Sequence, residues 1–218
     1  MYSKFLLQFS HVDCGFTKIY QQRFLCFKIF VLPRHTSENF VTNLLNKRPP
    51  MPRKSIMLIL NNIRSAFNVG SIFRTADAVG VEKIYLCGYT PTPLTSKEIS
   101  LHQDFGGRSK IAKTALGAEK SVAWEYVPQA WRLIERLKKE DVHIIALEQS
   151  SKSIDYRKYE PKFPLALIVG NEVNGMSKKV LNSCDAIIEL PMCGRKESLN
   201  VAVAFGIAAY KLMEKKRA

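Results

Sequence analysis

The sequence predicts one α/β domain whose mostly parallel sheet is flanked by helices. Apolar runs of five or six residues recur from Ser55 onward, helical patterns fill several of the gaps between them, and no repeat or low-complexity segment appears. Strands that are apolar at nearly every position are typical of sheets covered on both faces, as parallel strands joined by helices are. Six such runs are predicted as strands: 56–60, 83–87, 122–127, 142–147, 165–169 and 186–190.

Helical periodicity is clearest between Asn68 and Gly80, where Asn68 is a candidate N-cap and Gly80 a candidate C-terminal glycine. Residues 128–140 and 177–183 are predicted as further helices. A last helix from Ser198 to about residue 215 is apolar around nearly its whole circumference. Such a helix is buried on more than one side, which predicts either a homodimer formed through it or central burial within one chain.

The folded domain is predicted to span residues 51–218, because the segment before it differs in composition. Residues 1–50 hold seven of the twelve phenylalanines and end in the proline-rich run 47–52. We interpret residues 1–50 as a poorly ordered basic extension or a misassigned start, with an organellar transit peptide as a less favoured alternative.

The charge balance favours a polyanionic partner. The chain has 33 Lys and Arg against 19 Asp and Glu, a formal net charge of +14, and such a surplus promotes nucleic-acid binding by counterion release. A membrane is the competing partner, but no apolar run approaches the roughly 18 residues that span a bilayer. The five cysteines and four histidines show no metal-ligand spacing, so no metal site is expected. The cysteines are interpreted as reduced core residues, which suits a cytoplasmic protein.

Three polar clusters interrupt the apolar elements. The first, residues 61–74, contains Asn68 and Arg74, for which a helix cap and a solvated cation are the alternatives to a ligand site. Arg74 is expected beside Gly70, where a backbone gap would suit a phosphate or ribose. The loop 90–120, with its lysines and arginines, is a further candidate RNA contact.

The second cluster, residues 168–177, follows a predicted strand. Gly170 and Gly175 would allow close backbone approach to a ligand, although a tight turn is the alternative. The third cluster, residues 188–204, places Ser198 at a helix start and Asn200 two residues inside it. A buried carboxamide there needs hydrogen-bond partners, which a ligand site or a polar core would provide.

Together, the clusters resemble the three signature motifs of the SpoU, or TrmH-like, RNA ribose methyltransferases. The matching segments are Asn68-x-Gly-Ser-Ile-x-Arg74, Gly170-Asn-Glu-x-x-Gly175 and Leu190-Pro-Met-x-Gly-x-x-x-Ser198-Leu-Asn200-Val. The resemblance implies a deep C-terminal trefoil knot, a homodimer and a bent S-adenosylmethionine. It further implies a cofactor site with Leu147, Gly170, Asn171, Leu190 and Leu199, and a catalytic site with Asn68, Arg74, Glu172, Ser198 and Asn200.

The implied reaction methylates a ribose 2′-hydroxyl of structured RNA, with tRNA preferred over rRNA. Arg74 would be either the base or, because arginine stays protonated, a clamp on the adjacent phosphate and the developing alkoxide. Glu172 is expected to organise the cofactor loop. A catalytically silent RNA-binding module and a small-molecule methyltransferase are the alternative functions.

Overall fold

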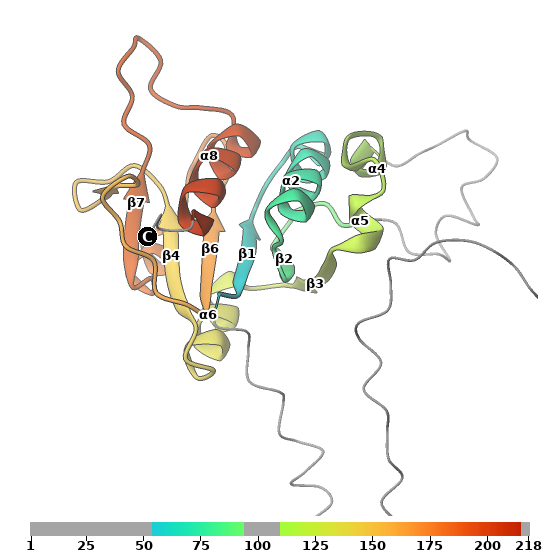
Figure 1. Cartoon of the computed structure of the whole chain (residues 1–218), viewed down its shortest axis with the longest axis horizontal. Coiled ribbons are helices and arrows are strands. Elements are labelled where there is room, and N and C mark those ends of the chain that lie inside the picture. Colours follow the sequence, from blue (N-terminus) through green and yellow to red (C-terminus); the bar gives the residue numbers. More distant parts are fainter. Residues whose placement is uncertain (1–53, 94–109, 215–218) are drawn as a thin grey trace, which may run out of the picture. The chain divides into compact units, whose positions relative to one another are not determined.

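The computed structural model describes residues 54–93 and 110–214 (Figure 1). The predicted extension over residues 1–50 lies outside these ranges, so the domain boundary near Met51 stays a prediction. Lys97 and Arg108 of the proposed RNA-contact loop also lie outside them.

In the described part of the chain, seven parallel strands form one sheet in the order β3-β2-β1-β6-β4-β7-β5. They are β1 (Ile56–Asn61), β2 (Lys83–Cys87), β3 (Ala123–Val127), β4 (His143–Leu147), β5 (Ile154–Asp155), β6 (Leu165–Val169) and β7 (Ala186–Glu189). Six of them confirm the predicted strands to within one residue at each end. The two-residue β5 was not predicted, because a segment that short carries no periodic signal.

The strand order places the later half of the chain against the first strand. The chain runs outward from β1 to β3, and β6 then occupies the position between β1 and β4. Leu165 therefore pairs with Ile56 on one side and with His143 on the other. The carboxyl ends of β1, β6 and β4 consequently lie next to one another, although their loops are far apart in sequence. The strand order alone does not establish the trefoil knot, which stays an expectation from the resemblance.

Helices cover both faces of the sheet, as the continuous apolar strands require. One face carries α2 (Ala66–Val79), α4 (Lys110–Ala115), α5 (Ala118–Ser121) and α8 (Val201–Met213), packed on Leu58 and Leu60 of β1. Figure 1 shows α2 and α8 side by side on this face. The opposite face, with Met57 and Ile59, packs against α6 (Ala130–Lys138) and α7 (Lys178–Asn182).

Two predicted helix starts are wrong by about three residues. The α2 helix begins at Ala66, and its N-cap is Ser65. The Ser65 hydroxyl accepts a hydrogen bond from the backbone N–H of Asn68 at 3.3 Å. The α8 helix begins at Val201 with Asn200 as its N-cap. In both cases a neighbouring polar residue satisfies the free amides, and periodicity alone does not choose between adjacent candidates. Gly80 is confirmed as the glycine just past the end of α2, where it caps the helix with a left-handed φ of 81°.

The segment 110–121, expected to be part of a loop, forms the short helices α4 and α5. Helices this short are stabilised by packing rather than by propensity, which explains why the sequence pattern missed them. The assignment of all cysteines to the core is also wrong for Cys193, which is exposed in the loop after β7. Within the described residues, no helix has the length and apolarity needed to cross a membrane.

Candidate active site

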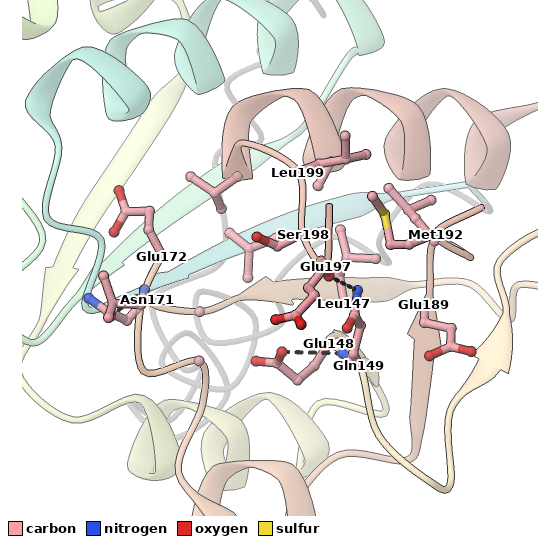
Figure 2. Close-up of a pocket in the computed structure, with 17 residues that line it drawn as sticks. Leu147, Glu148, Gln149, Asn171, Glu172, Glu189, Met192, Glu197, Ser198 and Leu199 are labelled. Carbon is pink, nitrogen blue, oxygen red and sulfur yellow. Dashed lines mark hydrogen bonds between the residues drawn. The ribbon is translucent and has the colours of Figure 1, made fainter. Parts of the chain in front are cut away.

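A cavity of about 340 Å³ lies at the carboxyl ends of β4, β6 and β7, beside the first turn of α8 (Figure 2). Open parallel sheets bind ligands at this edge. All five residues predicted to border the cofactor line the cavity: Leu147, Gly170, Asn171, Leu190 and Leu199. Glu172 and Ser198 of the predicted catalytic set line it as well.

The side chain of Asn171 holds the loop that forms one wall of the cavity. Its Nδ2 donates to the Asn62 carbonyl at 3.0 Å and to the Tyr89 hydroxyl at 2.8 Å. Its Oδ1 accepts from the amides of Val173 at 2.9 Å and Asn174 at 2.7 Å. Because two donor and two acceptor positions of this carboxamide are all used, the side chain of Asn171 is committed to shaping the loop.

Two glycines allow this loop to close upon itself. A Cβ on Gly170 would lie 2.5 Å from Cγ of Met176, and one on Gly175, where φ is +61°, would lie 2.7 Å from Oε2 of Glu148. The same Glu148 oxygen accepts from the Met176 amide at 3.0 Å. Of the two predicted reasons for these glycines, close approach of a ligand and a tight turn, these contacts favour the turn, because the atoms that exclude a side chain belong to the protein itself.

A chain of hydrogen bonds joins the three motifs. Asn68 Nδ2 donates to Glu172 Oε1 at 2.9 Å, and Asn68 Oδ1 accepts from Asn200 Nδ2 at 3.1 Å. Glu172 also accepts from the backbone amides of Arg64 at 3.0 Å and Ser65 at 3.3 Å, at the start of α2. One carboxylate therefore ties the cavity loop to α2, and through Asn68 to the start of α8.

Ionised Glu172 is favoured by these contacts. Partial burial would raise the pKa of its carboxyl, but hydrogen bonds from the Arg64 amide, the Asn68 side chain and nearby amides outweigh it and lower the pKa. The lowered pKa keeps Glu172 ionised, so its carboxylate accepts hydrogen bonds and donates none.

Asn200 does not lie inside a buried helix, contrary to the expectation. It is exposed and caps α8, with Oδ1 accepting from the Ala202 amide at 2.9 Å and the Val203 amide at 3.4 Å. The loop after β7 continues to residue 200, so the polar residues precede the helix.

Arg74 stands apart from the other predicted catalytic residues. Its side chain is exposed, does not line the cavity and makes no hydrogen bond or ion pair within the described ranges. The predicted backbone gap beside it is filled, since a Cβ on Gly70 would lie 2.1 Å from Oγ1 of Thr114 and 2.3 Å from the Ile111 carbonyl of α4. Asn68 is committed to Glu172 and Asn200 and does not orient Arg74.

Sequence reasoning did not assign several residues that line the cavity: Glu148, Gln149, Glu189, Met192 and Glu197. The Gln149 side chain donates through Nε2 to the backbone carbonyl of Glu197 at 2.7 Å, and the Gln149 backbone N–H donates to Glu148 Oε1 at 3.2 Å (Figure 2). For Glu148 and Gln149, the position directly after β4 was the available signal. Together with Glu172, three further carboxylates give this cavity an acidic lining in a chain of charge +14.

Comparisons with known proteins agree with this geometry. The model of the SpoU rRNA Methylase family matches residues 55–210. YacO of Bacillus subtilis (strain 168), assigned to the TrmH family of tRNA/rRNA methyltransferases, is 33% identical over 159 residues, which are 73% of this chain and 58% of that protein. A relative of the same assignment from Staphylococcus saprophyticus is 33% identical over 162 residues, 74% of this chain and 59% of that one. The chain thus spans less than two thirds of these curated relatives.

Solved structures give the same result. The A. aeolicus TrmH/SpoU tRNA modifying enzyme superposes with a TM-score of 0.61 and 30% identity, covering 73% of this chain and 74% of that one. The AdoMet-bound rRNA methyltransferase from Sinorhizobium meliloti superposes with a TM-score of 0.62 and 26% identity, covering 74% of this chain and 56% of that one. With the three motifs joined around one cavity, the family match over most of the domain establishes that this chain belongs to the SpoU rRNA methylase family.

Proposed function

We propose that this protein transfers the methyl group of S-adenosylmethionine to a ribose 2′-hydroxyl of structured RNA, with tRNA preferred. The observation that carries the proposal is the hydrogen-bonded chain from Glu172 through Asn68 to Asn200, which unites all three motifs beside one cavity. The similarity to a tRNA modifying enzyme supports the choice of tRNA.

The cavity suits S-adenosylmethionine in size and chemistry. Its volume of about 340 Å³ falls in the range of small-molecule sites. Leu147, Leu190 and Leu199 offer apolar walls for a purine, and Glu148 and Glu189 place carboxylates where a sulfonium or an ammonium would be attracted. When bound, the cofactor supplies a methyl group on a positively charged sulfur, so this displacement requires no metal.

The residues of the chain would then have to activate the hydroxyl. A ribose 2′-hydroxyl is a weak acid that must lose its proton as the new O–C bond forms, which requires a base or a strong electrostatic clamp. We assign Arg74 to the RNA phosphate and the developing alkoxide, because its guanidinium is exposed and uncommitted within the described residues. Ser198 and Asn200, at the start of α8, would border the ribose.

We also propose a homodimer through α8. Its inner face, with Phe205, is fully buried, whereas Val203, Ile207 and Tyr210 on its outer side are 51%, 40% and 59% exposed. Exposed apolar side chains gathered on one helix are typical of a surface covered by a partner.

The test combines cofactor titration with single-turnover methylation. Wild type is incubated with labelled S-adenosylmethionine and separated tRNA and rRNA, and 2′-O-methyl positions are mapped. Arg74→Ala should keep cofactor affinity and lose about a hundred- to a thousandfold in rate, the usual effect of removing one transition-state donor. Arg74→Lys should recover only part, because a point charge does not replace a bidentate fork.

Lys139→Ala, which removes an exposed cation from the end of α6, is the matched control. Wild-type rates in Arg74→Ala would contradict the assignment of Arg74. RNA binding without any transfer by the wild type would instead identify a silent RNA-binding module.

A further inference from the structure

A second cavity, of about 190 Å³, lies at the carboxyl ends of β1 and β2, between the starts of α6 and α7. Gly175 is the one described residue that lines both this cavity and the cofactor cavity. The loop after β6 therefore separates the two spaces. Nothing in the proposed reaction uses the smaller one.

Asn61 supplies a buried amide to this cavity. It is 7% exposed, lines the cavity, and its side chain has no hydrogen-bond partner among the described residues. Its place in β1 explains the direction of the side chain, because Met57 and Ile59 of the same pleat pack in the core on the α6 and α7 side. Among the described residues no side-chain nitrogen or oxygen is both fully buried and unpaired, so the carboxamide of Asn61 is reached from the cavity, where a ligand or water can pair with it.

The start of α6 provides a second, independent source of donors. The N-cap Gln129 makes no side-chain hydrogen bond to the first turn, and both Gln129 and Ala130 line the cavity. The nine-residue helix thus presents free backbone N–H groups and the positive end of its dipole to this space. Such helix starts favour anions.

Neighbouring groups agree with an anion rather than a cation. No residue that lines the cavity in the described part of the chain is acidic. Lys179 Nζ lies 3.4 Å from the ring centroid of Trp131, a lining residue, and so places a positive charge near the rim. The Ser177 hydroxyl accepts from the Val180 amide at 3.4 Å, and its proton remains available for a ligand oxygen.

We propose that this cavity binds one backbone phosphate of the RNA substrate; the inference rests on the proposed function. Asn61, the first-turn amides of α6 and Ser177 would donate to the phosphate oxygens. The volume is below that of typical sites for larger ligands, so it suits a phosphate group rather than a whole nucleotide. A phosphate held there would fix the RNA strand against Gly175, directly behind the cofactor cavity.

The test uses the full chain and two variants, Asn61→Asp and Gln129→Glu. Each places a carboxylate where the phosphate would bind. Gln129→Glu is not expected to impair folding, because an acidic group at a helix start favours the helix. Asn182→Asp, the same chemical change at an exposed position at the end of α7, is the matched control.

Binding of a tRNA is measured at several salt concentrations, with titrations of S-adenosylmethionine and of inorganic phosphate alongside. Both variants should bind tRNA about tenfold more weakly, with a salt slope reduced by about 0.7 to 0.9, the value of one phosphate contact. Cofactor affinity should be unchanged, and the control should match the wild type.

Three outcomes would overturn the inference. Folded variants that bind tRNA as tightly as the control would exclude an RNA phosphate from the cavity. Variants that lose inorganic phosphate but keep tRNA affinity would show that the cavity holds a free anion. A wild type that binds no RNA at all would refute the proposed function itself and the inference with it. The tRNA titration of the wild type distinguishes this outcome from the other two.

Discussion

Replacing Asn171 with alanine would remove the side chain that shapes the cofactor loop. The change deletes four hydrogen bonds, to Asn62, Tyr89, Val173 and Asn174. Each of these hydrogen bonds contributes about 1 kcal/mol net to stability, so together they contribute about 4 kcal/mol. Water can replace those made to Val173, Asn174 and the 57%-exposed Tyr89, so we expect a loss of about 1.5 to 3 kcal/mol in the free energy that keeps the loop in place.

The loss should appear mainly as weaker cofactor binding. Only the fraction of molecules with a formed loop binds, so we expect the dissociation constant for S-adenosylmethionine to rise, by up to about ten- to a hundredfold when the whole loss falls on that fraction. Calorimetric titration gives the constant, and urea denaturation gives the global stability. Asn174→Ala, in the same loop at an exposed position, is the matched control. If Asn171→Ala bound the cofactor with wild-type affinity, the loop would not depend on this side chain and the reasoning would be refuted.

Other predictions concern α8, Glu172 and the cysteines. Tyr210→Glu should give folded monomers in sedimentation, whereas Phe205→Glu, at a fully buried position, should unfold the chain; a monomeric wild type would contradict the dimer. Because folding lowers the pKa of Glu172, the stability that its carboxylate contributes is present above about pH 4.5 and is lost as the pH falls through the folded pKa. Glu172→Gln should therefore flatten the dependence of unfolding free energy on pH in this acid range. An unchanged dependence in the variant would contradict this role of Glu172. Burial raises the pKa of Cys87 to about 12, so iodoacetamide at pH 8 should label exposed Cys193 before Cys87, as peptide mapping would check.

The sequence was sufficient for six of the strands and for the identity of the motifs, but not for β5, α4 and α5. Strands such as β2 and β6 are apolar at nearly every position, and the sheet buries them on both faces, so hydrophobic pattern and final burial carry the same information. The motif residues were found because three polar clusters stand in the order and spacing of a known family. That resemblance implied Leu147, Gly170 and Leu199 as cofactor residues, and all three line the cavity.

What the sequence did not determine depends on contacts between distant residues. Glu172 and Asn68 are 104 positions apart and Asn200 and Asn68 are 132 apart, and they meet because β6 inserts between β1 and β4. The tertiary structure also reassigned Gly70 from a ligand gap to the packing of α4. It separated Arg74 from the cavity and placed Asn61, whose side chain has no hydrogen-bond partner among the described residues, beside the start of α6. Periodicity reports only which side of an element is buried, whereas the partner of a buried polar group is decided by whichever distant backbone or side chain the folded sheet brings within hydrogen-bonding distance.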